Sequence, residues 1–180
     1  WIDIGATDQT DAASVVAIAD AVTVQMGFQE LRNGLANAPA MDNRTGLWVV
    51  IEALRLAKER GISCTLYAAS TVQEEIGHRG TITAAFGIDP HVAIAVDVTH
   101  ATDCPNIDKR QRGTVNLGGG PVIVRGPNIN PRVGDRLQEL AAAKGIPYQV
   151  TALSRGAPND ANALQLTRAG VATGLVQLPN

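Results

Sequence analysis

Helical and extended patterns of apolar residues alternate along the chain from residue 42 onward. Between Gly46 and Arg60 the apolar residues recur three and four positions apart, which predicts an amphipathic helix. Gly61 follows directly and favours a left-handed helix end. Strands separated by helices predict an open α/β sheet with helices on both faces. The other helices are expected at 80–86, 131–144 and 160–169, and the strands at 63–70, 91–98, 146–153 and 171–178.

The first 40 residues have a different pattern. Short apolar stretches at 2–4 and 21–26 are separated by glycines, and no helical period is visible after Ala19. We therefore predict part of a β-rich accessory domain in residues 1–38 and an α/β catalytic domain in residues 39–180. Because the chain starts inside a strand-like run and stops abruptly, we expect it to be a fragment, truncated at both ends.

Composition narrows the class of protein. The chain has 15 Lys and Arg against 17 Asp and Glu, a net charge of −2, so it lacks the basic character of a nucleic-acid binder. A hydrophobic fraction of 45% excludes intrinsic disorder. No apolar run approaches the roughly 20 residues that cross a bilayer, so no membrane partner is expected. Cys64 and Cys104 form no disulfide framework, as is typical of reduced thiols in a cytoplasmic protein.

Acidic residues stand at three junctions between the predicted elements. Asp97 ends an apolar strand, Glu74 and Glu75 follow another strand, and Asp42 precedes the first long helix. Each has a structural alternative, as a turn residue, a solvated loop pair or a helix cap. Ligand groups collect at the carboxyl ends of strands in open α/β sheets, and clustered carboxylates are costly without a cation. Their coincidence in a chain with few charges therefore favours a shared metal ion.

The adjacent pair Glu74 and Glu75 suggests hydrolysis. Neighbouring residues of an extended loop point in opposite directions, so one carboxylate can bind a metal while the other faces a water that the metal activates. The second carboxylate then takes the proton as general base. Imidazoles often join such sites, but we expect His78 and His91 at the surface and a hydrogen-bonding role for His100.

Several longer motifs accompany these acids along nearly the whole chain. They are WIDIGA at 1–6, AMDNRTG at 40–46, TVQEEIG followed by RG at 71–80, IAVDVTH at 94–100, GGPVI at 119–123 and GPNINP at 126–131. Together they resemble the dinuclear-metal aminopeptidases that assemble as tetrahedral dodecamers. That family includes glutamyl and deblocking aminopeptidases, and some members carry a cellulase or endoglucanase label.

The resemblance implies a three-layer α/β sandwich with a central mixed sheet, plus an inserted β-rich domain for oligomerisation whose second half corresponds to residues 1–38. It also implies two divalent metal ions (Zn, Co or Mn), with Asp42 as the bridging ligand. Glu75 and Asp97 would each bind one metal, and Glu74 would be the catalytic general base. The implied reaction is removal of the N-terminal residue of a peptide substrate, catalysed by a homo-oligomer.

The sequence departs from the family in two places. The family's histidine ligands, one in an upstream HxD motif and one after the last strand, do not fall within these residues. The family segment Gly-Thr-Asp-Ala is Pro158-Asn-Asp-Ala161 here. We therefore expect the 180 residues alone to hold metal weakly or not at all, unless flanking residues complete the site. The alternatives are a non-catalytic scaffold on the same fold and a carboxylate-pair glycosidase, which an aromatic content of 3% disfavours.

Overall fold

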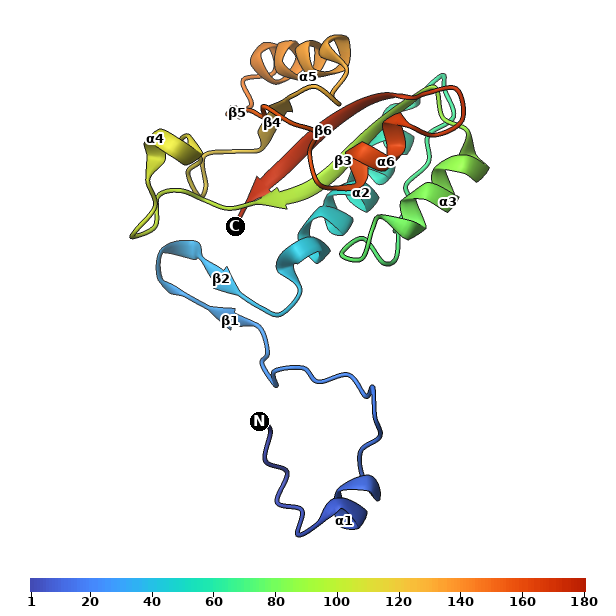
Figure 1. Ribbon diagram of the computed structural model, residues 1–180. Helices are drawn as coiled ribbons and strands as arrows, with labels where there is room; N and C mark the ends of the chain where they lie inside the picture. Colours follow the sequence, from blue (N-terminus) through green and yellow to red (C-terminus); the bar gives the residue numbers. More distant parts are fainter. The chain divides into compact units, whose positions relative to one another are not determined.

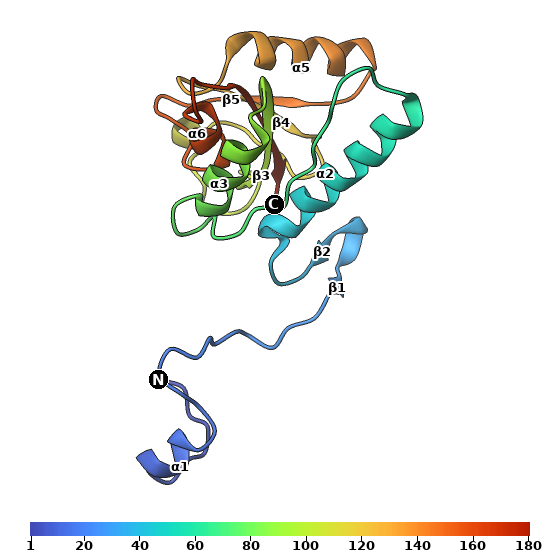
Figure 2. The same cartoon turned by 90° about the vertical axis from the view of Figure 1, so that its right-hand side faces the viewer.

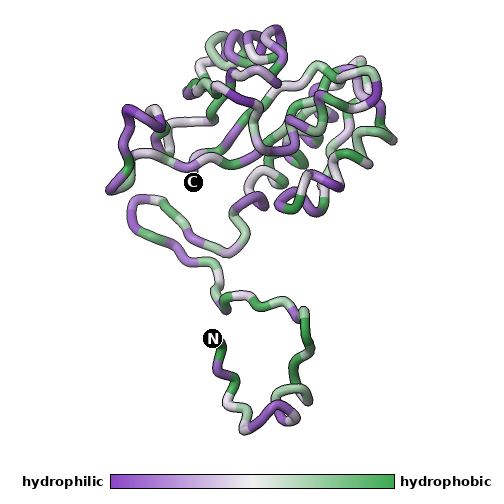
Figure 3. Tube along the Cα trace, in the orientation of Figure 1, coloured by the Kyte–Doolittle hydropathy of each residue, from purple (hydrophilic) through white to green (hydrophobic).

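The computed structural model describes residues 1–180 and divides them into two units, Trp1–Pro39 and Ala40–Asn180. The first unit has little regular structure (Figure 1). The apolar stretches at 2–4 and 21–26 form no strand, so the expected β-rich character is limited to one very short antiparallel pair. Many of the residues that follow the short helix at 9–13 are apolar (Figure 3), and their large apolar side chains are exposed. Its elements are α1 (Gln9–Ala13), β1 (Gln29–Glu30), η1 (Arg32–Gly34) and β2 (Ala36–Asn37).

The second unit is built on a mixed sheet, as the family resemblance implied, and one of its four strands, at 122–125, was not among the expected strands. The strands are β3 (Val92–Thr99), β4 (Val122–Arg125), β5 (Gln149–Ala152) and β6 (Ala172–Pro179), in the order β3-β6-β4-β5. The pairs β3–β6 and β4–β5 are parallel, and β4–β6 is antiparallel. In β3–β6 the register aligns Asp97 with Gln177, so Asp97 lies toward the carboxyl end of β3.

Helices cover both faces of this sheet. Figure 2 shows α2 on one side of β3 and β6, and α3 with α6 on the other, while α5 packs against β4 and β6. Gly61 ends α2 with a φ of +69°, as expected. At the ends of α3 and α6, Arg168 lies 4.0 Å over the Phe86 ring and donates to the Phe86 carbonyl oxygen. The helices are α2 (Met41–Arg60), α3 (Arg79–Ile88), α4 (Lys109–Arg112), α5 (Pro131–Ala143) and α6 (Asp160–Gln165).

The strand predicted at 63–70 is absent. These residues run without regular structure, and no strand pairs with the outer edge of β3. An extended segment without a ladder partner leaves its backbone groups to solvent, so it does not register as a strand. Leu66 and Tyr67 accordingly stay exposed.

Small and branched aliphatic side chains form the core. Leu175 of β6 and Val122 and Val124 of β4 are completely buried. Ala161 of α6 joins them, so this helix packs close to the sheet. The cluster also contains Ala95, Val115, Ile129 and Ala157.

None of the helices is long and apolar enough to span a bilayer.

Replacing Leu175 by Ala is expected to lower the free energy of unfolding by roughly 2–5 kcal/mol, because a fully buried leucine leaves a cavity. Leu166→Ala is the matched control, since that side chain is 72% exposed and its loss should change stability by no more than about 0.5 kcal/mol. Urea unfolding measures both. Equal losses in the two variants would contradict the assignment of this core.

Candidate functional site

Asp97 is the centre of the candidate site, and its carboxylate is held from three directions. The Val98 N–H donates to Oδ1 at 2.8 Å, and the Asn43 side-chain amide lies 3.4 Å from the same oxygen. The Asn159 amide donates to Oδ2 at 3.0 Å. Three donors on a half-buried carboxylate hold it in one orientation at the carboxyl end of β3.

Asp42, at the beginning of α2, lies near enough to Asp97 for its charge to raise the pKa of that carboxyl. Asn43 anchors this helix start, because its amide donates to the Val96 carbonyl oxygen at 2.8 Å and its Oδ1 accepts the Gly46 N–H at 2.8 Å. A Cβ at Gly46 would collide with the Asn43 side chain, so the close approach requires glycine here. The sequence suggested a helix cap as an alternative role for Asp42, but Asn43 supplies the capping hydrogen bond. The Asp42 carboxylate is exposed and makes no hydrogen bond.

A closed loop after Thr71 carries Glu74. The Glu74 carbonyl oxygen accepts the N–H groups of Gly77 and His78, and Gly80 N–H donates to the Val72 carbonyl oxygen at 2.9 Å. A Cβ at Gly80 would lie 2.5 Å from the Val72 nitrogen, so only glycine lets the two ends of the loop meet. The His78 Nε2 lies 3.2 Å from Glu74 Oε1, which corrects the expectation that this histidine is a surface residue.

Asp160 joins the site from the start of α6. Its Oδ2 accepts the Thr71 hydroxyl at 3.0 Å, while its Oδ1 is buried and has no hydrogen-bond partner. A buried carboxylate oxygen without a donor is costly, since it has lost water and gained nothing in exchange. Such an atom marks a place where a further positive group would be stabilising.

The electrostatics of these acids are coupled. Burial raises the pKa of Asp97 above its ordinary 3.8, against the lowering effect of the Val98 N–H and the Asn159 amide, and the charges of Asp42 and Asp160 raise it further. Each of these carboxylates thus lies close enough to Asp97 to oppose its ionisation.

Glu74 belongs to the same coupled group. Burial raises its pKa above the ordinary 4.5, and the charges of Asp97, Asp160 and Glu75 add to this rise, while His78 opposes it. No Lys or Arg pairs with any of these acids, whose only ion pair is the one to His78. The negative charge at the carboxyl end of β3 is therefore uncompensated.

The sequence-predicted residues are only partly brought together. The charge of Asp42 acts on Asp97 and that of Asp97 acts on Glu74, whereas the Glu75 side chain is exposed. No group of three or more His, Cys, Asp or Glu side chains is arranged so that it could hold a metal ion. His91 and His100 are exposed.

The chemistry of the donors nevertheless fits a divalent cation. Carboxylate oxygens are hard ligands, and no Lys or Arg pairs with the exposed Asp42 or with the partly buried Glu74, Asp97 and Asp160. The buried Oδ1 of Asp160 without a hydrogen-bond donor is the observation in favour of this fit. Burial is the main cause of the raised pKa values of Asp97 and Glu74, and a bound cation would offset the repulsion that adds to it.

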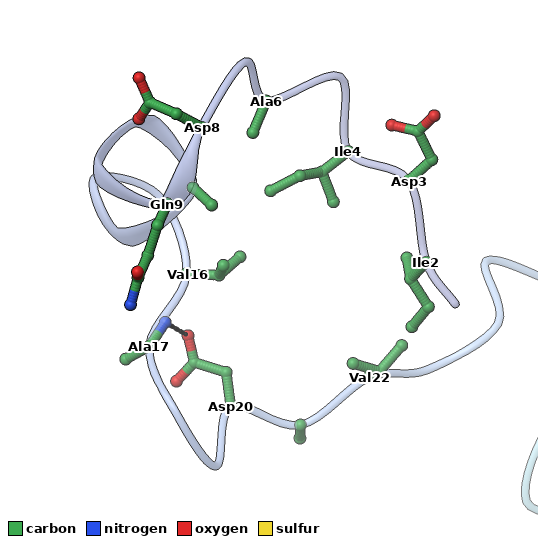
Figure 4. Close-up of a pocket in the computed structure, with 12 residues that line it drawn as sticks. Ile2, Asp3, Ile4, Ala6, Asp8, Gln9, Val16, Ala17, Asp20 and Val22 are labelled. Carbon is green, nitrogen blue, oxygen red and sulfur yellow. Dashed lines mark hydrogen bonds between the residues drawn. The ribbon is translucent and has the colours of Figure 1, made fainter.

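A pocket of about 820 Å³ lies elsewhere, within the first unit. Ile2, Ile4, Val16 and Val22 point into it, but all four remain substantially exposed (Figure 4). None of the sequence-predicted site residues lines it. The chain segments around it form an open loop, so we place the functional site at β3 instead.

Three residues of the site were not singled out from the sequence. Asn43 and Asn159 reach Asp97 from positions 54 and 62 residues away, and Asp160 was noted only as part of a family segment. The Asn159-Asp160 pair is a typical helix-capping pattern, so the sequence could suggest a helix start there. It could not indicate that Asn159 reaches the Asp97 carboxylate.

Comparison with known proteins gives consistent matches. The family model of M42 glutamyl aminopeptidase matches residues 1–180. The lysyl aminopeptidase of Pyrococcus furiosus is 38% identical over 181 residues, which is 99% of this chain and 50% of that protein.

Two solved structures share the fold. The aminopeptidase APDkam598 from Desulfurococcus kamchatkensis is 32% identical with a TM-score of 0.82, over 98% of this chain and 50% of that one. The TET1 peptidase of Pyrococcus horikoshii, which can assemble into a tetrahedron or a large octahedral shell, is 27% identical with a TM-score of 0.80. That match covers 98% of this chain and 51% of the other. The chain thus spans about half the length of these relatives.

In the metal-free protein, Glu74→Gln is expected to raise the free energy of unfolding at pH 7, by less than about 1 kcal/mol because solvent screens a side chain that is 34% exposed. Burial raises the pKa of Glu74, so the folded chain holds the proton more tightly than the unfolded chain. Protonated Glu74 therefore stabilises the folded state. This contribution is fully present below the ordinary pKa of 4.5 and is lost as the pH rises through the raised pKa of Glu74 in the folded chain.

Urea unfolding at pH 4 and pH 7 measures this difference, with Glu75→Gln as the exposed neighbour for comparison. The gain of the Glu74→Gln variant over the wild type should grow with pH. A gain that stays constant, or that Glu75→Gln matches, would contradict the electrostatic description.

Proposed function

Because the chain belongs to the M42 glutamyl aminopeptidase family, we propose that the protein is a metal-dependent aminopeptidase that removes N-terminal residues from peptides. The matched relatives are aminopeptidases and peptidases, and the match extends over almost the whole of this chain. The family match and the site are separate lines of support, since Asp42, Glu74 and Asp97 were selected because they stand at junctions between the predicted elements.

One observation carries the proposal. At the carboxyl end of β3, burial raises the pKa values of Asp97 and Glu74, and the nearby charges of Asp42 and Asp160 on Asp97, and of Asp97 and Asp160 on Glu74, add to this rise. No Lys or Arg pairs with these acids. Natural proteins bring carboxylates together in this way where a cation or a proton is part of the function. The carboxyl end of a strand in an α/β sheet is also where such ligands are usually found.

Asp42 and Asp97 are the residues that would hold a divalent cation, and Glu75 would be a further ligand. Asp42 is exposed and free of hydrogen bonds, so its oxygens are available. Three hydrogen-bond donors orient the Asp97 carboxylate, so the lone pairs that could bind a cation point in fixed directions. A divalent cation supplies two effects when bound, since it polarises the scissile carbonyl and makes water a stronger acid.

Glu74 would act as the general base. A base must be mostly ionised yet able to take a proton near neutral pH, and burial raises the pKa of Glu74 in the required direction. His78 lies 3.2 Å from one of its oxygens, which leaves the other oxygen for the proton of water. The proton can then pass from Glu74 to the amine that leaves as the peptide bond breaks.

We also propose that the protein works as a homo-oligomer. The support is the likeness to the Pyrococcus horikoshii peptidase, whose assemblies are a tetrahedron and a large octahedral shell. Peptide substrates would then reach the sites through the assembly.

Removal of divalent ions with EDTA is expected to abolish hydrolysis of aminoacyl-p-nitroanilides by the full natural chain, and added Mn²⁺, Co²⁺ or Zn²⁺ should restore it. Loss of a residue that only hydrogen-bonds to a metal ligand typically weakens metal binding roughly 10- to 100-fold, and Asp97→Asn, which alters a ligand itself, should weaken it by more. Asp135→Asn is the control, because that carboxylate pairs with Arg125 on the surface. Hydrolysis of the anilide that persists without metal would contradict the proposal and favour a metal-independent peptidase.

Glu74→Gln is expected to lower kcat by about 100-fold or more, because loss of a general base removes the group that takes the proton. Binding of the ion should change only a few-fold, which calorimetric titration of the same variant measures. Glu139→Gln, on the exposed surface of α5, is the matched control. A variant that keeps its kcat would rule out Glu74 as the base.

A further inference from the structure

Asn159 connects α6 to the carboxylate of Asp97. Its side chain is buried, with only 3% of the residue exposed, and its Nδ2 donates to Asp97 Oδ2 at 3.0 Å. Its Oδ1 accepts the N–H of Ala161 at 3.2 Å and so caps the helix. Both ends of the side-chain amide are thus occupied.

The capping hydrogen bond fixes which way the amide points. A flipped amide would turn its oxygen toward the Asp97 carboxylate and its NH₂ group toward the Ala161 N–H, so both contacts would become repulsive. Because Asn159 is buried, it has no water to satisfy it in that orientation. The donor therefore faces Asp97 by necessity.

Asp97 depends on this donor for its orientation. The Val98 N–H donates at 2.8 Å and the longer Asn43 contact of 3.4 Å is to the same oxygen, Oδ1. The Asn159 amide is the hydrogen-bond partner of Oδ2. Donors on both oxygens fix the plane of a carboxylate, whereas donors on one oxygen leave it free to turn about the Cβ–Cγ bond.

We propose that Asn159 is a positioning residue of the cation site, which sets the plane of the Asp97 carboxylate and thereby the affinity for a divalent cation. This inference rests on the proposed function and extends it to a residue outside the acidic set. Groups that orient a metal ligand typically contribute 10- to 100-fold to metal affinity.

The test separates this role from helix capping. Asn159→Ala removes the cap and the donor together, while Asn130→Ala removes only a cap, because Asn130 accepts from the N–H groups of Arg132 and Val133 at the start of α5. Mn²⁺ affinity of the full natural chain is measured by calorimetric titration, and the unfolding temperature of the metal-free protein is measured for each variant. We expect both to lower the unfolding temperature and only Asn159→Ala to weaken Mn²⁺ binding, by about 10- to 100-fold.

Each outcome decides the matter. Equal Mn²⁺ affinity in Asn159→Ala and the wild type would overturn the positioning role and leave the proposed function intact. A wild type that binds no Mn²⁺, Co²⁺ or Zn²⁺ would overturn both. If Asn159→Ala does not fold, Asn159→Gly replaces it, since glycine costs only a few tenths of a kcal/mol as a helix cap. A folded Asn159→Gly variant with wild-type affinity would likewise overturn the proposal.

Discussion

Repulsion among carboxylates at the carboxyl end of β3 is the constraint around which this part of the molecule is arranged. Asp42, Glu74, Asp97 and Asp160 come from four separate segments, and no Lys or Arg accompanies them. Such a group is unfavourable by itself, because burial and like charge both oppose ionisation. Binding of a cation would offset the unfavourable free energy of this group of carboxylates, which explains why a metal-dependent peptidase, as we propose, would contain it.

The backbone around these acids is also unusual. Ala40, Gln73 and His78 have left-handed conformations with φ near +60°, next to the segments that carry Asp42 and Glu74. A side chain other than glycine costs about 1–2 kcal/mol in this region, so the surrounding contacts must enforce it. Local strain at these positions and uncompensated charge at the acids occur together, which is a common property of functional sites.

Much of the fold could be predicted because it depends on local patterns. The helix that ends at Gly61, the apolar strand that leads to Asp97 and the alternation of helices and strands follow from periodicity, and the family assignment from the motifs is confirmed. The segment 63–70 has a strand-like composition, but a strand also needs a partner, and the described residues supply none.

The site was predictable only in part. The acids at Asp42, Glu74 and Asp97 could be selected because they stand at junctions between elements, and their charges act on one another in the structure. Their supports could not, since a hydrogen bond between Asn159 and Asp97 spans 62 residues and has no signature in spacing. The roles of Asp42, Glu75 and Asp97 as metal ligands and of Glu74 as general base stay predictions, and among these residues Asp42 and Glu75 are exposed.

Anomalous diffraction from crystals of the full natural chain with Mn²⁺ or Zn²⁺ tests the central claim most directly. A peak about 2.0–2.2 Å from carboxylate oxygens of both Asp42 and Asp97 is the result that a shared cation predicts. A fully occupied peak elsewhere in the molecule, or no peak beside Asp97 in an enzyme that is active in the crystal, would contradict it.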